Sequence, residues 1–193
     1  KTSTIHGRRA YIGNYNVNKD GVIKSYPDSI IASNVNRFDE FPLKNALEVS
    51  VNDGDEIVAL KGFSDKLLEF KSLKLSIINI GGEFPFLESE YPQMGLNNEN
   101  AIAETELGVF WVNTYGAYWF NGEEVINLLF REGKRLLKQS TWENLVSSDE
   151  KVLLGYNAND KSLFIINKAE GADYGFRYSL TTGGWAKIAG DGV

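Results

Sequence analysis

The 193-residue chain has no cysteine and a single histidine, His6. Without cysteine, the chain can form no disulfide framework, no thiolate nucleophile and no cysteine-ligated metal site. One histidine excludes a His-rich zinc site, and any Ser-His-Asp triad would have to use His6. Because His6 stands beside Arg8 and Arg9, we expect it to face solvent or an adjacent chain. We therefore predict no catalytic residue, no metal site and no cofactor.

Long apolar runs are also missing. No run approaches the roughly 20 residues that cross a bilayer, and no basic-then-apolar leader opens the sequence, so no membrane-spanning segment is predicted. The glycine-containing phrases match neither a P-loop nor GxGxxG, which argues against a nucleotide cradle. The net charge of -6 argues against general electrostatic binding of nucleic acid.

What the sequence has in abundance is short apolar runs of about four to eight residues, bounded by Gly, Asn, Asp and Ser, a pattern typical of strands and turns. The clearest pairs are linked by polar segments short enough for antiparallel hairpins. They are Glu56–Leu60 with Lys66–Phe70, Gly108–Asn113 with Ala117–Phe120, and Val152–Tyr156 with Ser162–Asn167.

Two further hairpins fit the same pattern. One joins Arg8–Tyr15 to Gly21–Ser25, and the other lies within Tyr178–Ile188, where Trp185 is expected to wedge between sheets. The hairpins recur at roughly 45 to 50 residues, the spacing of a four-stranded sheet repeated around an axis. We therefore predict a single all-β, β-propeller-like domain over residues 1–193, with about four blades of repeated antiparallel hairpins and little helix.

Three segments do not follow the pattern of strands and turns. Ser140 and Glu143 have capping-box spacing ahead of a short helix at Thr141–Ser147. Glu123–Lys138 fits either a helix or a strand plus a loop. Gly81–Asn100 lacks periodicity, and we expect it to be a projecting loop that carries recognition.

Asp53-Gly54-Asp55 could be a metal loop or a turn. The EF-hand spacing is absent. We favour a turn in which Gly54 takes a positive φ and Asp55 caps the strand entered at Ile57.

Acidic residues such as Glu83, Glu88, Glu90, Glu104 and Glu106 are numerous. A glycosidase needs two carboxylates a few ångströms apart, but the sequence brings no pair together. A solvated acidic face is the default interpretation.

Aromatic residues are dense around residues 110–120. Strand alternation places Phe110 and Val112 on one side and Trp111 and Asn113 on the other. Packing between sheets is the favoured interpretation; the alternative is a contact surface for protein or sugar. The residues of that candidate interaction surface are Trp111, Tyr115, Trp119, Phe84, Phe86 and Tyr91.

The phrases "GVIKS", "SNVNRFDEFP", "VNDGDEIVALKGFSDKLLEFKSLKLSII" and "AETELGVFWVNTYGAYWFNGEEVINL" occur in this order. The chain from about Arg8 to Ile188 thereby resembles the β-propeller part of tailed-bacteriophage tail-nozzle and tail-hub proteins, the packaged-DNA stabilisation family. The most specific part of the resemblance is Asp53–Ile80, followed by Tyr118-Trp119-Phe120-Asn121-Gly122.

The resemblance implies a structural virion protein that is assembled in the host cytoplasm. It would form a homo-oligomeric ring below the portal and adaptor and close the DNA exit channel, with tail fibres as further partners. DNA would pass acidic walls without specific binding. The chain would be a fragment of a longer virion protein, and no catalytic residues are implied. The alternatives are a carbohydrate-binding propeller and, less favoured, a glycoside hydrolase of sialidase type.

Overall fold

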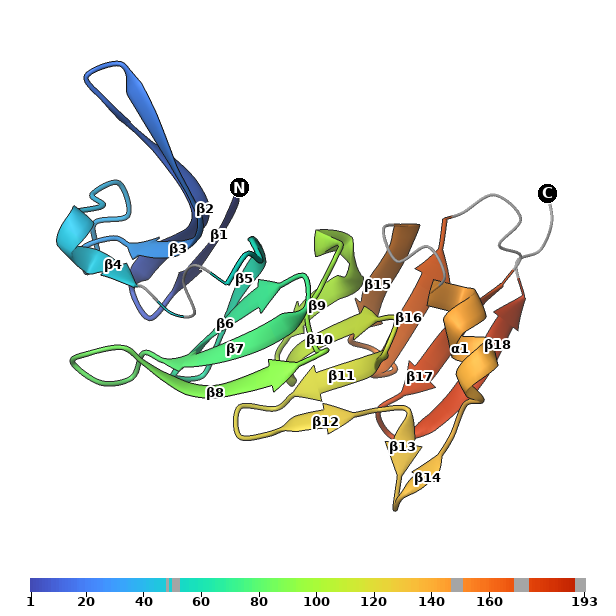
Figure 1. The fold of residues 1–193 in the computed structure, drawn as a ribbon. Helices are drawn as coiled ribbons and strands as arrows, with labels where there is room; N and C mark the ends of the chain where they lie inside the picture. The colour runs from blue at the N-terminus through green and yellow to red at the C-terminus, as the bar shows by residue number, and fades with distance from the viewer. Residues whose placement is uncertain (48, 50–52, 147–150, 169–173, 190–193) are drawn as a thin grey trace. The chain divides into compact units, whose positions relative to one another are not determined.

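The computed structural model describes residues 1–47, 49, 53–146, 151–168 and 174–189. The chain divides into two compact units, Lys1–Leu96 and Asn97–Val193. Each unit contains two four-stranded antiparallel sheets whose strands follow one another in chain order (Figure 1).

The first unit begins with the sheet β1-β2-β3-β4, in which the 3-10 helix η1 (Leu43–Asn45) leads into the last strand. The second sheet of this unit has the order β5-β6-β7-β8. The strands are β1 (Thr2–His6), β2 (Arg9–Lys19), β3 (Val22–Ala32), β4 (Ala46–Leu47), β5 (Ile57–Phe63), β6 (Lys66–Lys71), β7 (Lys74–Asn79) and β8 (Phe86–Pro92).

Apolar side chains from both sheets form the core of the first unit. Tyr11, Ile30 and Ala32 of the first sheet pack with residues of the second, namely Ile57, Leu60, Leu67 and Ile78. Where β1 crosses β5, the ring of His6 lies directly over Gly62, and any Cβ at position 62 would collide with it. His6 Nε2 also lies 2.6 Å from the carbonyl oxygen of Ser64, so this histidine helps to join the two sheets.

The second unit holds the sheets β12-β11-β10-β9 and β15-β16-β17-β18 and the small ribbon β13-β14. Its elements are η2 (Glu99–Ala101), β9 (Ile102–Thr105), β10 (Gly108–Asn113), β11 (Gly116–Phe120), β12 (Val125–Asn127), β13 (Phe130–Arg131), β14 (Lys134–Arg135), α1 (Gln139–Val146), β15 (Val152–Asn157), β16 (Ser162–Asn167), β17 (Tyr174–Ser179) and β18 (Gly184–Ala189).

Two tryptophans join the sheets of the second unit. Trp142 of α1 is fully buried and donates from Nε1 to the carbonyl of Asn113 at 3.0 Å. Its ring meets that of Trp185 edge-on at 5.9 Å. Trp185 in turn donates to the carbonyl of Leu128 at 2.9 Å, which confirms the prediction that it lies between sheets.

The all-β prediction is confirmed, with four four-stranded antiparallel sheets and one short α-helix among the described residues. All five predicted hairpins are present, and several of their strands are one to seven residues longer than predicted. The arrangement of the sheets as blades of a propeller remains a prediction.

The prediction of a projecting loop over Gly81–Asn100 is wrong for the central part of this segment. Phe86–Pro92 forms β8, which pairs antiparallel with β7. Edge strands are commonly charged and end on proline, and that composition concealed this strand. Glu88 and Glu90 face Lys66 and Lys74 across the sheet.

Two other predictions are settled around α1. Glu123–Lys138 adopts the strand alternative, as β12, β13 and β14. The helix starts at Gln139, two residues before its predicted start, so Ser140 lies within it and forms no capping box. The amides of Thr141 and Trp142 donate to the Lys138 carbonyl instead. The predicted last residue, Ser147, lies outside the described residues.

Candidate functional site

The aromatic residues of β10 and β11 pack on both faces of their sheet. Phe110 stacks with Trp119 at 5.5 Å and with Tyr156 of the neighbouring sheet at 6.4 Å. Trp111 stacks with Tyr118 at 5.3 Å. The predicted alternation is therefore confirmed.

Burial removes Trp111 from the candidate interaction surface, because its side chain is fully enclosed. Trp119 is half-buried, and its Nε1 donates to the Leu107 carbonyl at 2.9 Å. Of the three residues predicted in this region, only Tyr115, at the β10–β11 turn, is substantially exposed, at 51%.

The other three predicted surface residues lie in the first unit. Phe84 is 77% exposed and Phe86 is 54% exposed. Tyr91 of β8 is half-buried. Phe84 contributes to the wall of a cavity described below.

Several of the acidic candidates are held by neighbouring side chains. Glu88 accepts from Lys66 at 2.6 Å and from Asn79 at 2.7 Å. Glu106 accepts from the Tyr156 hydroxyl at 2.8 Å. Within the described ranges, no group of three or more His, Cys, Asp or Glu residues could hold a metal ion.

Asp53-Gly54-Asp55 forms a turn at the edge of the second sheet. Gly54 has φ +80°, as predicted, and the Asp55 amide donates to Asp53 Oδ1 at 3.1 Å. The predicted cap at Ile57 is wrong. The Asp55 carboxylate instead accepts from the amides of Ser72 and Leu73, at 3.1 and 2.9 Å, and so fixes the β6–β7 turn.

We expect Asp55→Ala to lower the free energy of unfolding by about 0.5–2 kcal/mol, because two turn amides lose their acceptor. Thermal or urea unfolding measures this loss, with Asp39→Ala, at an exposed turn, as control. Calcium should leave the melting temperature of the parent chain unchanged. A calcium-dependent rise would contradict the turn interpretation.

Next to this turn lies a polar cluster, defined here as Asp53, Glu69, Lys71, Lys74 and Glu90, of which Glu69 and Lys71 are buried. The Lys71 ammonium is fully buried and lies 2.9 Å from the Asp53 carboxylate. Lys74 lies 2.8 Å from Asp53 and 3.0 Å from Glu90. Burial alone would raise the pKa of Asp53, but hydrogen bonds from Lys74 and Lys71 outweigh it and lower the pKa to about 2. Cations already occupy the carboxylate that a metal ion would need.

Glu69 is the exceptional member of the polar cluster. Its side chain is fully buried, and neither carboxyl oxygen has a hydrogen-bond partner among the described residues. Burial raises its pKa to about 8, although Lys71 and Lys74 oppose the shift. At neutral pH this carboxyl is therefore mostly protonated. The carboxyl is enclosed in the sheet and has no exposed surface.

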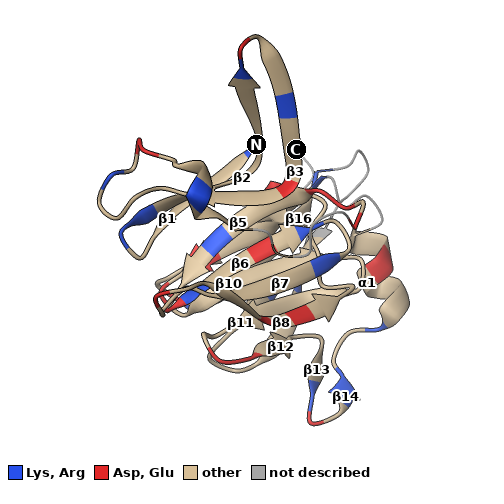
Figure 2. Cartoon of the chain, turned by 60° about the vertical axis from the view of Figure 1, so that its left-hand side comes forward, with Lys and Arg blue, Asp and Glu red and all other residues tan. Residues whose placement is uncertain are grey.

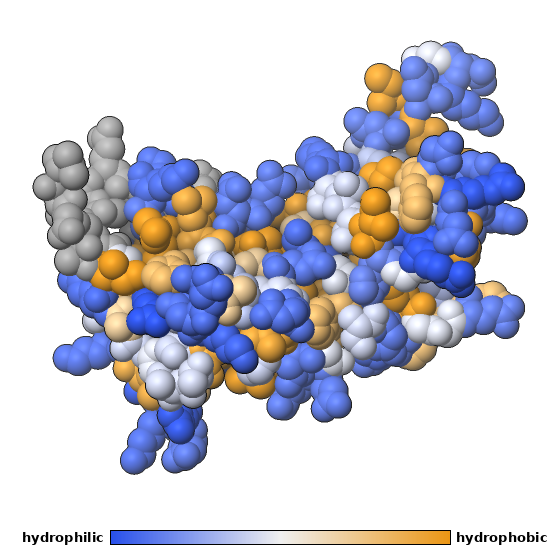
Figure 3. All heavy atoms as spheres, turned by 180° about the vertical axis from the view of Figure 1, so that it is seen from behind, coloured by the Kyte–Doolittle hydropathy of each residue, from blue (hydrophilic) through white to orange (hydrophobic). Residues whose placement is uncertain are grey.

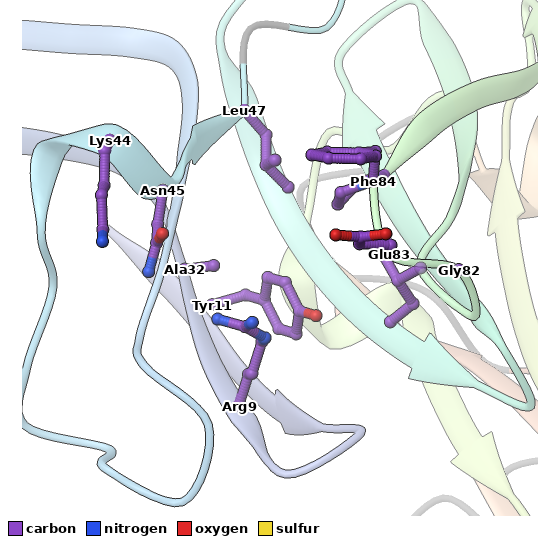
Figure 4. Close-up of a pocket in the computed structure, with 11 residues that line it drawn as sticks. Arg9, Tyr11, Ala32, Lys44, Asn45, Leu47, Gly82, Glu83 and Phe84 are labelled. Carbon is purple, nitrogen blue, oxygen red and sulfur yellow. The ribbon is translucent and has the colours of Figure 1, made fainter.

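A cavity of about 230 Å³ lies in the first unit, between the ends of β2 and β3, the segment from η1 to β4 and the β7–β8 loop (Figure 4). Its apolar wall consists of Tyr11, Ala32, Leu47, Ile80, Phe84 and Pro85. In the close-up, the side chains of Leu47 and Phe84 approach each other at one end (Figure 4).

Charged groups lie at the rim of this cavity. Arg9 is held by a 2.5 Å hydrogen bond from its guanidinium to the Ser33 carbonyl. Lys44 is exposed and forms no ion pair within the part of the chain that the structure describes, and Glu83 supplies one acid. With two cations and one acid, the rim is positive on a chain of net charge -6.

Of the residues that line this cavity, the sequence had suggested only Phe84, as a surface residue, and Glu83, as one of many acids. Arg9, Lys44 and Leu47 come from three separate strand ends and loops, and nothing in their spacing brings them together. The exposed apolar pair Val22-Ile23 was also missed, although it stands directly after a turn in the phrase "GVIKS".

In the described residues, the only α-helix has eight residues, and no helix has the length and apolar character to cross a membrane. Neither a scan against models of protein families nor a search of curated proteins finds a match to the chain.

Proposed function

We propose that the chain is a structural, non-enzymatic protein of a tailed-phage particle, part of the tail nozzle or hub. The observation that carries this proposal is the succession of four antiparallel four-stranded sheets in chain order. Such repetition is how propeller blades are built. The order of sequence phrases described above supplies the phage assignment.

The proposed partners are further copies of the chain in a ring, the adaptor or portal above it, and tail fibres. DNA would pass the ring without sequence-specific binding, consistent with the net charge of -6. The proposed location is the virion. The carbohydrate-binding and hydrolase alternatives are not favoured by any specific contact in the described part of the chain.

Immunogold electron microscopy of tailed particles, with an antibody raised against residues 1–193, tests the assignment. We expect label at the distal end of the tail. Unlabelled tails in a culture that contains the soluble protein would defeat the proposal, and a glycan-binding screen would then take priority.

A further inference from the structure

The carboxyl of Glu69 lies inside the first unit, whereas charged side chains of proteins mostly lie at the surface. Figure 3 shows hydrophilic residues over much of the visible face. Glu69 of β6 is paired with Leu60 of β5 on one side and with Ser76 of β7 on the other. The hydroxyl of Ser76 is also buried and also lacks a hydrogen-bond partner among the described residues. The acid therefore fits this position only in its neutral form, because an unpaired buried charge is costly.

An ammonium group lies on the same face of the same strand. Side chains two residues apart on a strand point to the same side, about 7 Å apart along the strand, so Glu69 and Lys71 share one face of β6. Lys71 is fully buried and donates to both carboxylate oxygens of Asp53 at 2.9 Å. The same carboxylate lies 2.8 Å from Lys74. Lys71 is thus bound to one carboxylate while a second, neutral carboxyl stands beside it.

The carboxylate that Lys71 binds belongs to the turn at residues 53–55, which precedes β5. The Asp55 carboxylate of this turn accepts from the amides of Ser72 and Leu73, in the loop that follows β6. The two ammonium groups and these two amides hold the turn to the second sheet. A change in the partner of Lys71 would therefore act on the turn and on the loop together.

The other titratable groups around Glu69 come from β7, β8 and the first sheet. Lys74 of β7 lies 3.0 Å from Glu90 of β8, and red and blue bands lie near one another on this sheet in Figure 2. Tyr11 of the first sheet belongs to the core, and burial raises the pKa of its hydroxyl above the ordinary value, so it stays neutral where Glu69 titrates. Of the two ammonium groups, Lys71 lowers the pKa of Glu69 more than Lys74 does.

We propose that Glu69 and Lys71 form a pH-sensitive switch: when Glu69 loses its proton, the Lys71 ammonium turns from Asp53 to Glu69, and the turn at residues 53–55 loosens. While Glu69 is neutral, Lys71 stays on Asp53. Once Glu69 is ionised, two carboxylates compete for this buried ammonium. Glu69 has no other hydrogen bond among the described residues, whereas Asp53 keeps Lys74, so Lys71 moves to Glu69.

The direction of the switch follows from the two pKa values. Burial raises the pKa of Glu69 to about 8, so Lys71 changes its partner as the pH rises through this value. Asp53 is ionised throughout this range, because its pKa is about 2. The inference concerns a conformational response of the first unit and does not depend on the proposed function.

Carbon-13 NMR of the side-chain carboxyls between about pH 6 and 9.5 tests the exchange of partners. We expect the Glu69 signal to titrate and the Asp53 signal to move with the same midpoint, although Asp53 is already ionised. In Glu69→Gln the Asp53 signal should stay constant. Glu123→Gln, at an exposed position, is the matched control and should follow the parent. A constant Asp53 signal in the parent, or a Glu69 signal that does not titrate in this range, overturns the proposal.

Amide hydrogen exchange tests the loosening of the turn. Protection factors correct for the faster intrinsic exchange at high pH. In the parent we expect protection of the Ser72 and Leu73 amides to fall about tenfold from pH 7 to 9, as for the loss of one charged hydrogen bond. In Glu69→Gln it should stay constant. The Leu180 amide, which donates to the Lys161 carbonyl in a turn of the second unit, should stay constant in both chains.

The hydrogen-exchange result also separates the switch from a general loss of stability. A general loss leaves turn amides unchanged when they exchange by local opening, and it lowers protection of the strand amides instead. Constant protection of Ser72 and Leu73 in the parent, or an equal fall in the parent and in Glu69→Gln, overturns the proposal. A melting temperature at pH 7 that is not below that of the parent shows that Glu69→Gln is folded.

Discussion

Replacing Glu69 by glutamine is expected to stabilise the protein at pH 8 and above, and to flatten the dependence of stability on pH. The carboxyl lies in the middle of the second sheet, opposite Leu60 on β5 and Ser76 on β7. Lys71, Lys74, Asp53 and Glu90 are the charged groups that act on it. A glutamine keeps the shape of the protonated acid and has no charge to bury.

The direction in which pH changes the stability follows from the direction of the shift in the pKa of Glu69. Burial raises the pKa of Glu69 from 4.5 to about 8 in the folded chain. Below pH 4.5 both states hold the proton, and stability is unaffected. Between pH 4.5 and 8 the unfolded chain ionises while the folded chain does not, so stability falls as pH rises. At about 1.4 kcal/mol per unit, the loss amounts to about 4–5 kcal/mol.

Urea unfolding of the parent and Glu69→Gln between pH 4 and 9 measures this effect. Glu123→Gln, at an exposed position, is the matched control and should follow the parent curve. Asp53 acts in the opposite sense, because its low pKa adds stability that disappears as pH falls from about 4 toward 2. We therefore expect maximum stability near pH 4–5. A parent whose stability rises from pH 5 to 8 would contradict the account of Glu69.

Trp111→Ala is expected to lower the free energy of unfolding by about 3–5 kcal/mol, the usual cost of truncating a buried aromatic side chain. Trp111 has no exposed surface and stacks with Tyr118. Its removal leaves a cavity next to β11 that the packed sheet can fill only in part. Chemical unfolding monitored by circular dichroism gives the value.

Tyr115→Ala is the matched comparison, since it removes an aromatic ring from the next turn at a site that is half exposed. We expect its effect to stay within about 0.5 kcal/mol. Similar costs for the two variants would mean that Trp111 does not have the packing role assigned to it.

The hairpins could be predicted because their signals are local. Asn113 shows why, since its side chain accepts from the amides of Tyr115 and Gly116 and fixes that turn without help from distant residues. Asn157 does the same for the amide of Asn159. The strand β8 was missed because the charges that hold it, Glu88 and Glu90, meet their partners on other strands.

The buried polar residue, the exposed aromatic residue and the cavity depend on tertiary structure, and local sequence signals could not predict them. Glu69 stands in "KLLEFK", where both faces of the strand are buried, and alternation cannot show that a charged residue faces inward. Tyr115 and Trp111 have the same aromatic character in sequence, yet only packing between strands decides that one is exposed and the other enclosed. Arg9 and Lys44 are brought to the same cavity by the pairing of β2, β3 and β4.

The bulge at Asn14, where the register of β2 with β3 shifts, separates this hairpin into two parts. The inner part pairs with β1 and β4, whereas residues 15–26 pair only with each other. Adding or removing two residues in each strand of the outer part would move its tip by about 7 Å and keep every side chain on its face. The length of the outer part can therefore change while the core pairing below the bulge stays the same.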